Sequence, residues 1–196
     1  IVFPKGSNWV NWWDPSIVYK GGSTLSGYNC PIDEFPAFKR SGSIIPMNIS
    51  SAYSGGIHGD HRHKDHITFI ISYPSIKKKE TAHLRYLDSH GIEVSYEFKG
   101  ENKIELSMSA HKNAPDAIFL IQGVQYSKDA LGLTYVREDG EMIQSRRVSS
   151  KEFWQISQNV HQSLMTVDSD NQIKIRALKN ERGARLLLEG VFIVET

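Results

Sequence analysis

Cysteine is nearly absent from this sequence, which has one among its 196 residues. A single thiol cannot form an internal disulfide, so packing and hydrogen bonds must hold the fold together. Cys30 has no His or Asp beside it in the sequence to activate it as a nucleophile. We therefore interpret Cys30 as a buried or half-buried spacer next to Pro31.

Charge of one sign and long apolar runs are also lacking. The formal net charge is +1, which gives no reason to expect a nucleic acid or an anionic membrane surface as a partner. No apolar run approaches the length that crosses a bilayer, and the first residues lack the basic-then-apolar pattern of a signal peptide. We expect no nucleic-acid and no membrane partner. The chain opens on Ile-Val-Phe-Pro without a Met, and we interpret it as a piece of a longer protein.

What the sequence does contain is a series of short apolar segments divided by turn residues. Hydrophobic residues make up 39% of the chain and aromatic residues 10%, which is enough for a packed core. Residues 83–87, 92–98 and 103–108 alternate apolar and polar side chains, a period of two that places one face in a core and one in water. Further strands are predicted at 1–3, 9–13, 17–19, 23–25, 44–45, 67–73, 117–124, 131–136, 142–143, 172–176, 185–188 and 191–194. This pattern predicts an all-β fold, an antiparallel β-sandwich.

Local signals predict the connections and one helix. Gly21-Gly22 indicates a hairpin between the strands that flank it. Residues 48–65 are rich in Ser, Gly and His and are predicted to be a linker or long loop. Residues 150–164 form the only predicted helix, capped by Ser149 or Ser150.

The segment from Pro31 to Pro46 combines a rigid connection with a turn. Proline fixes φ at positions 31 and 36, so the residues between them are predicted to be stiff and extended. Ser41-Gly42-Ser43 marks a turn or bulge, and Ile44-Ile45 is predicted to be a short buried strand that Pro46 closes.

Three sequence blocks resemble glycoside hydrolase family 31, which includes α-glucosidases and α-xylosidases. The blocks are Ile1-Val-Phe-Pro-Lys-Gly-Ser-Asn-Trp-Val-Asn-Trp-Trp13, Tyr19-Lys-Gly-Gly-Ser-Thr24 and Pro31-Ile-Asp-Glu-Phe-Pro-Ala-Phe-Lys-Arg-Ser-Gly-Ser-Ile-Ile-Pro46. Their order and spacing are similar to the family's segment after the catalytic barrel. That segment has an aromatic pair, Gly-Gly-x-Thr, and Pro-Leu-Asp-x-x-Pro-x-Phe-x-Arg-x-Gly-x-Ile-Ile-Pro. The resemblance covers about the first quarter of the chain firmly.

The resemblance implies a domain order of catalytic (β/α)8 barrel, small proximal β-domain and distal β-sandwich. Residues 1–47 are then the end of the proximal C-terminal β-domain, and residues 48–196 are the distal C-terminal β-sandwich domain. It also implies a parent enzyme that hydrolyses α-glucosides or α-xylosides. The catalytic barrel of that enzyme is then the partner that this chain braces.

No catalytic residue is assigned in this chain. A retaining glycosidase needs two carboxyl groups that face each other across the scissile bond, and the resemblance places both in the barrel, in motifs such as Trp-x-Asp-Met-Asn. No such motif occurs here, and Trp13-Asp14-Pro15 is predicted to be a turn. Asp33 and Glu34 are adjacent, so on an extended chain they point to opposite faces. We expect neither catalytic aspartates nor a cofactor in these residues.

A tryptophan cluster supports an alternative function. Trp9, Trp12 and Trp13 have flat faces that suit the apolar faces of sugar rings, as in an independent carbohydrate-binding β-sandwich module. Large aromatic side chains in a strand are more often part of a core or an interface, and we prefer that interpretation.

A histidine cluster supports a second alternative. His58, His61, His63 and His66 lie with two aspartates in one short segment, and such ligands suit Zn²⁺ or Ni²⁺. The spacing matches no fixed metal motif, and Arg62 and Lys64 add repelling charge. We therefore predict a solvated loop without a metal, and keep these histidines as weak candidates.

Overall fold

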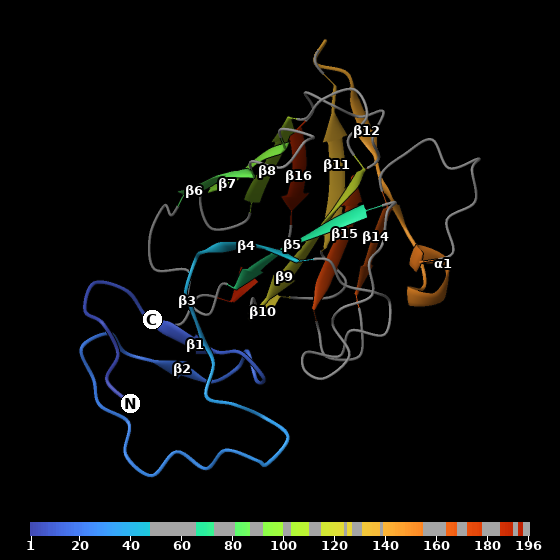
Figure 1. Cartoon of the computed structure of the whole chain (residues 1–196). Coiled ribbons are helices and arrows are strands. Elements are labelled where there is room, and N and C mark those ends of the chain that lie inside the picture. The colour runs from blue at the N-terminus through green and yellow to red at the C-terminus, as the bar shows by residue number, and fades with distance from the viewer. Residues whose placement is uncertain are drawn as a thin grey trace.

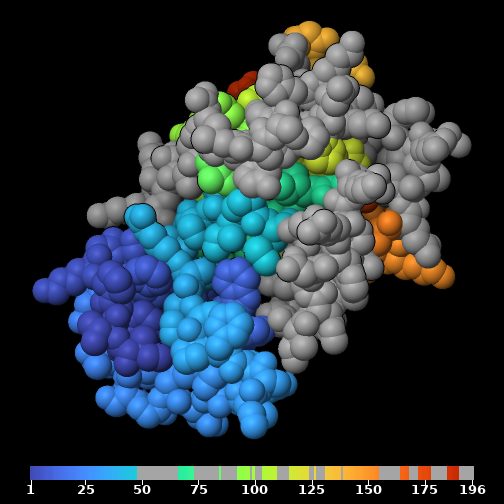
Figure 2. Space-filling model, viewed as in Figure 1, coloured from blue at the N-terminus to red at the C-terminus, as the bar shows by residue number. Residues whose placement is uncertain are grey.

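The computed structural model describes residues 1–47, 66–72, 81–86, 92–99, 103–109, 115–123, 125–126, 131–137, 139–154, 164–167, 172–177, 185–189 and 192–193. In these residues the chain is built from strands and one short helix, arranged as a small β unit beside a two-layered β-sandwich (Figure 1). Figure 2 shows the small unit, in blue, as a lobe at the lower end of the molecule on this face. The predicted all-β sandwich is confirmed.

Two six-stranded sheets form the sandwich. Sheet one has the order β12 (Met142–Gln144), β11 (Gly132–Val136), β16 (Arg185–Glu189), β8 (Lys103–Ser109), β7 (Ile92–Phe98) and β6 (Thr81–Tyr86). Sheet two has the order β13 (Arg146–Arg147), β14 (Leu164–Val167), β15 (Ile173–Ala177), β9 (Asp116–Gln122), β5 (His66–Ser72) and β4 (Ile44–Met47). A separate pair joins β10 (Gln125–Tyr126) to β17 (Phe192–Ile193).

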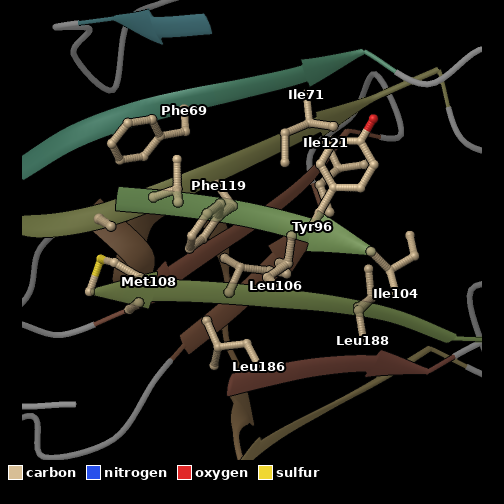
Figure 3. Packing of buried hydrophobic residues seen from close by; sticks show 14 of the residues in the cluster. Phe69, Ile71, Tyr96, Ile104, Leu106, Met108, Phe119, Ile121, Leu186 and Leu188 are labelled. Atoms are coloured by element: carbon tan, nitrogen blue, oxygen red, sulfur yellow. The ribbon is translucent and has the colours of Figure 1, made fainter. Parts of the chain in front are cut away.

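Sheet one is apolar on one face, and this alternation builds the core. Ile104, Leu106 and Met108 of β8 are buried, while the residues between them are partly exposed. They pack in one cluster with Phe69 and Phe119 of sheet two (Figure 3). Burying a side chain of this size stabilises the fold by about 1.5–3 kcal/mol, so the period of two seen in the sequence is what closes the sandwich.

Sheet two is buried on both faces at its centre. All seven residues of β5 are buried, and β5 pairs with β9 in parallel. Parallel strands covered on both sides have continuous apolar runs rather than alternation, which is the pattern of residues 67–73. The helix α1 (Ser150–Trp154) covers part of the outer face, because its Phe153 packs in one cluster with Ile118 and Leu164.

The predicted helix is right at its start and wrong at its end. Ser149 is the cap, since its Oγ accepts a hydrogen bond from the Glu152 amide at 3.2 Å. Leu164 begins β14, a strand that the sequence did not predict. Residues 155–163 lie outside the described residues.

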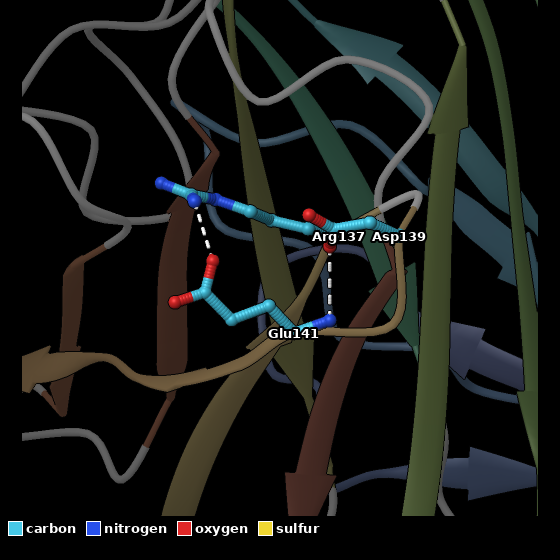
Figure 4. Close-up of polar contacts among 3 residues, drawn as sticks. All are labelled: Arg137, Asp139 and Glu141. Atoms are coloured by element: carbon cyan, nitrogen blue, oxygen red, sulfur yellow. Dashed lines mark hydrogen bonds and ion pairs between the residues drawn. The ribbon is translucent and has the colours of Figure 1, made fainter.

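The turn from β11 to β12 is tied by polar contacts (Figure 4). The Glu141 amide donates to Asp139 Oδ1 at 3.0 Å, and the side chains of Arg137 and Glu141 form an ion pair at 2.5 Å. Met142, which follows at the start of β12, is exposed.

The small sheet has the order β2 (Val18–Tyr19), β1 (Trp9–Asn11) and β3 (Phe38–Arg40). Aromatic rings pack on one of its faces: Phe3 stacks on Tyr19 with centroids 4.8 Å apart, and Phe38 meets Phe3 edge-on at 4.9 Å. These contacts supply a miniature core that a three-stranded sheet needs for stability.

The predicted hairpin at Gly21-Gly22 is wrong. Segment 17–19 pairs with β1, and Thr24 instead forms a bridge with Val2. Gly21 is required for steric reasons and Gly22 for its backbone conformation. A Cβ on Gly21 would lie 2.2 Å from the Ser7 carbonyl oxygen, and Gly22 has φ of +83°, where side chains are disfavoured.

The turn at residues 41–43, which the sequence predicted, joins the small sheet to the sandwich. The Gly42 amide donates to the Ser72 carbonyl at 2.8 Å, and Tyr96 Oη donates to the Gly42 carbonyl at 2.7 Å. Pro46 lies within β4 rather than closing it; β4 is at the end of the described sheet, where a missing amide donor is tolerated. The division at residue 47 stays a prediction, and β4 itself is hydrogen-bonded to β5.

Candidate functional site

The three tryptophans proposed for sugar binding have separate surroundings. Trp9 Nε1 donates to the Pro4 carbonyl at 3.0 Å. Trp13 Nε1 donates to the Phe35 carbonyl at 2.8 Å, and its ring meets Phe35 edge-on with centroids 5.3 Å apart. Each ring is half-buried, and none of the ring contacts in the described part of the chain joins two of the three. Their role in carbohydrate binding stays a hypothesis.

Trp12 belongs to the junction between the small sheet and the sandwich. Lys39 Nζ lies 5.2 Å from the centre of the Trp12 ring, a cation–π contact. The same Nζ donates to Gln122 Oε1 at 2.5 Å, and Gln122 is in turn bonded to Ser72 and Gln172. Lys39 is 3% exposed, and burial lowers its pKa from 10.5 to about 8.

The burial of Lys39 was not predicted from the sequence. In a strand that alternates between core and solvent, Phe38 would face inward and Lys39 outward. Here both faces of β3 are covered, because Phe38 packs with Phe3 while Lys39 reaches β9. No local signal distinguishes such a lysine, since the residue that buries it is 83 positions away.

The weak metal candidates fall largely on residues that the structure does not describe. His58, His61 and His63 lie outside the described residues. His66 is buried in β5, with its ring 5.7 Å from that of Trp154. Within the described ranges, no group of three or more His, Cys, Asp or Glu residues could hold a metal ion. A metal site stays a hypothesis.

Two of the described aspartates have structural partners. Asp14 accepts hydrogen bonds from the amide and hydroxyl of Ser16 at 2.9 and 2.6 Å, which confirms the turn predicted there. Asp116 is paired with Arg176 on the outer face of sheet two, at 2.9 Å. These contacts give both groups a role in holding the fold.

Exposed apolar side chains gather on the small unit. In the described residues the large exposed ones number seven, and six of them precede residue 36: Ile1, Val2, Ile17, Val18, Ile32 and Phe35. The seventh is Met142, at the sandwich. Large exposed apolar groups concentrated in one region are typical of a surface that contacts another body. No helix in the described part of the chain is long and apolar enough to cross a bilayer.

Comparison with known sequences gives a partial match. No known family model matches the chain. Among curated proteins, an isomaltosyltransferase from Sporosarcina globispora is 39% identical over 56 residues, a match that covers 29% of this chain and 5% of that protein.

Comparison with solved structures gives a match over nearly the whole chain. A cycloalternan-forming enzyme from Listeria monocytogenes, in complex with a pentasaccharide substrate, matches 99% of this chain with a TM-score of 0.71 and 18% identity, over 17% of its own length. An α-1,4-glucan lyase from Gracilariopsis lemaneiformis matches 96% with a TM-score of 0.70 and 14% identity, over 20% of its length. A family 31 dextranase from Flavobacterium johnsoniae, complexed with glucose, matches 97% with a TM-score of 0.67 and 17% identity, over 24% of its length.

This chain thus spans a quarter or less of each matched enzyme. Its two sheets and its small β unit together correspond to a minor share of those structures, which confirms the resemblance carried by the three sequence blocks. The chain has the fold of the C-terminal β region of family 31 glycoside hydrolases.

Proposed function

We propose that this chain is the non-catalytic C-terminal β region of a family 31 glycoside hydrolase, and that it braces the catalytic barrel of the same enzyme. The observation that supports this most directly is the match itself. Nearly all of this chain is similar to 17–24% of several such enzymes, so the greater part of each enzyme has no counterpart here.

The contacts inside the chain agree with a bracing role. Asp14 and Asp116 are engaged by Ser16 and Arg176, and no catalytic pair was expected from the sequence. The apolar side chains exposed on the small unit give it a surface to bury against another body.

The parent enzyme is proposed to act on α-linked glucosides, with α-xylosides as the other substrate class. The names of the similar proteins include a glucan lyase, a dextranase and an isomaltosyltransferase, and these favour glucosides. This part of the proposal concerns the whole enzyme, of which the chain is a minor share.

The test is hydrolysis by the 196-residue chain alone. We expect no turnover of fluorogenic α-glucoside or α-xyloside, with an intact-mass measurement to show that no longer polypeptide is present. The full-length enzyme assayed beside it is expected to be active. Turnover that stays with this chain through purification would mean that two of its carboxylates meet, and the non-catalytic role would be wrong.

The same sample tests the alternative function. Binding on a glycan array without hydrolysis would favour the carbohydrate-binding module. Loss of that binding in the Trp9→Ala, Trp12→Ala or Trp13→Ala variant would assign it to the tryptophans.

A further inference from the structure

The connection from residue 31 to residue 36, which we call the strap, is held rigidly by its backbone. Proline at both ends fixes φ, and the Glu34 amide donates to the Pro31 carbonyl at 3.0 Å. The Cys30 thiol donates to the Glu34 carbonyl at 3.2 Å. Trp13 Nε1 anchors the Phe35 carbonyl. The shape of the strap is therefore fixed without help from the Ile32 side chain.

The strap presents its largest apolar side chains to solvent. Ile32 is fully exposed, and Phe35 is 64% exposed although one edge meets Trp13. Asp33 and Pro36 beside them are exposed as well. A rigid segment that displays apolar groups has already lost most of the conformational entropy that binding would otherwise cost. Such preorganisation is what a contact surface needs and what an ordinary surface loop does not.

The small unit exposes a further apolar side chain at the turn of residues 13–17. Ile17 is exposed and follows the turn that contains Trp13, which is closed by the Ile17 amide donating to the Asp14 carbonyl at 3.1 Å. The strap lies in the connection between β2 and β3, drawn in light blue along the lower end of the molecule, away from the sandwich (Figures 1 and 2). Ile32 and Phe35, with the Trp13 ring against that of Phe35, are the docking surface.

We propose that the docking surface seats the strap against the catalytic part of the same polypeptide, in an apolar recess that receives Ile32 and Phe35. This inference rests on the proposed function and names the surface that performs it. The occupant follows from the comparisons, since at least three quarters of each similar enzyme lies outside the region that this chain matches.

A second copy of the chain fits this surface less well. A symmetric contact centred on the strap would bring Asp33 of one copy toward Asp33 of the other, and like charges that face each other oppose association. A partner that offers an apolar recess, with Asp33 at its wet rim, has no such cost.

The test is thiol labelling of the full-length enzyme. Cys30→Ser removes the thiol beside the strap and keeps a hydroxyl donor for the Glu34 carbonyl. In that background Ile32→Cys is compared with Met142→Cys, which is 62% exposed at the sandwich and far from the strap in sequence. Maleimide modification at each site is followed by peptide mass spectrometry, and each rate is divided by the rate at the same site in urea.

We expect Ile32→Cys to react at least about tenfold more slowly than Met142→Cys, because the core of an interface excludes water and reagent. Equal rates at the two sites would overturn the inference. Protection of Ile32→Cys that disappears on dilution of the enzyme would show that a second copy of the chain covers the strap. That result would also overturn the inference.

A third variant separates this inference from the proposed function. Val2→Cys probes an exposed apolar position outside the docking surface, at 73% exposure. If Val2→Cys is protected while Ile32→Cys is open, the chain braces the enzyme through another face, and only the docking surface is wrong. If all three sites are open, the bracing role itself is wrong.

Discussion

At the residue scale, the lysine at the junction carries the clearest consequence for stability. Lys39 is surrounded by an amide oxygen and an aromatic ring, and burial is the cause of its lowered pKa. A charged group in such a site is poorly solvated, so the folded protein holds the proton less tightly than the unfolded chain does. The junction is then less stable at neutral pH than the same packing would be without the charge.

Replacing Lys39 with Met is expected to raise stability at pH 7 by about 1–3 kcal/mol. Below pH 8 the Lys39 amine is protonated in both the folded and the unfolded chain, so the free-energy cost of burying its charge is fully present. Between pH 8 and 10.5 the unfolded chain holds the proton that the folded chain has lost, so wild-type stability rises with pH. Urea unfolding at pH 7 and pH 9.5 measures both effects, and the Lys39→Met variant should lack the contribution of Lys39 to this rise.

Lys20→Met, at an exposed position, is the control. Lower stability of Lys39→Met at pH 7 would mean that the contact with Trp12 outweighs desolvation.

Gly21 sets a second test at this scale. An added Cβ would meet the Ser7 carbonyl oxygen at 2.2 Å, which only a backbone shift relieves. Gly21→Ala is expected to destabilise the chain by about 2 kcal/mol or more. Gly132→Ala is the control, because nothing lies within 4 Å of its Cβ position, and its effect should stay within about 1 kcal/mol. Equal urea midpoints for the two variants would contradict the close approach at Gly21.

At the element scale, the start of the helix can be tested with adjacent serines. The sequence left Ser149 and Ser150 as alternative caps, and the structure assigns the cap to Ser149. Ser149→Ala is expected to cost about 1 kcal/mol, because it leaves an amide of the first turn without its acceptor. Ser150→Ala is expected to change stability by less than about 0.5 kcal/mol, since it is exposed within the first turn. The reverse order of the two losses in urea unfolding would show that Ser150 is the cap.

The elements also show where sequence reasoning ends. Residues 92–98 and 103–108 were predicted as strands because a strand with one buried and one exposed face has alternating apolar and polar residues in the sequence. The strand at Leu164–Val167 was missed because its apolar residues continue the spacing of the predicted helix, and spacing alone does not separate the two. The parallel pairing of β5 with β9 was not predicted either, since it joins segments about 50 residues apart and leaves no local signal.

The candidate surface was predictable in part. Proline at positions 31 and 36 indicated a rigid, extended connection. The extended part of that prediction is wrong, because residues 31–34 form a turn closed by the Glu34 amide donating to the Pro31 carbonyl, and Trp13 holds the Phe35 carbonyl in place. That Ile32 faces solvent could not be predicted, because an apolar residue in a stiff segment is equally compatible with a core. The docking of Trp12 against Lys39 depends on the tertiary fold in the same way.

At the scale of the whole molecule, the docking surface predicts a difference between the chain alone and the enzyme. Ile32→Ser should change the stability of the 196-residue chain by less than about 0.5 kcal/mol, because the side chain is fully exposed. In the full-length enzyme the same change should cost about 1–3 kcal/mol, the value of burying a side chain of this size. Thermal unfolding of both proteins measures the difference, with Met142→Ser as the control. An equal effect in the two proteins would contradict docking through the strap.

The short turn at Gly42 has a consequence for any attempt to divide the molecule. The chain passes from the small sheet into β4 within three residues, and the turn is bonded to both Ser72 and Tyr96. A fragment that begins after Met47 would lack β4, leaving the backbone of β5 unpaired along that side and uncovering Ile70. An unpaired apolar strand is a template for aggregation. The smallest piece that stays soluble should therefore begin before Ser41, even though the sequence blocks place the change of domain later.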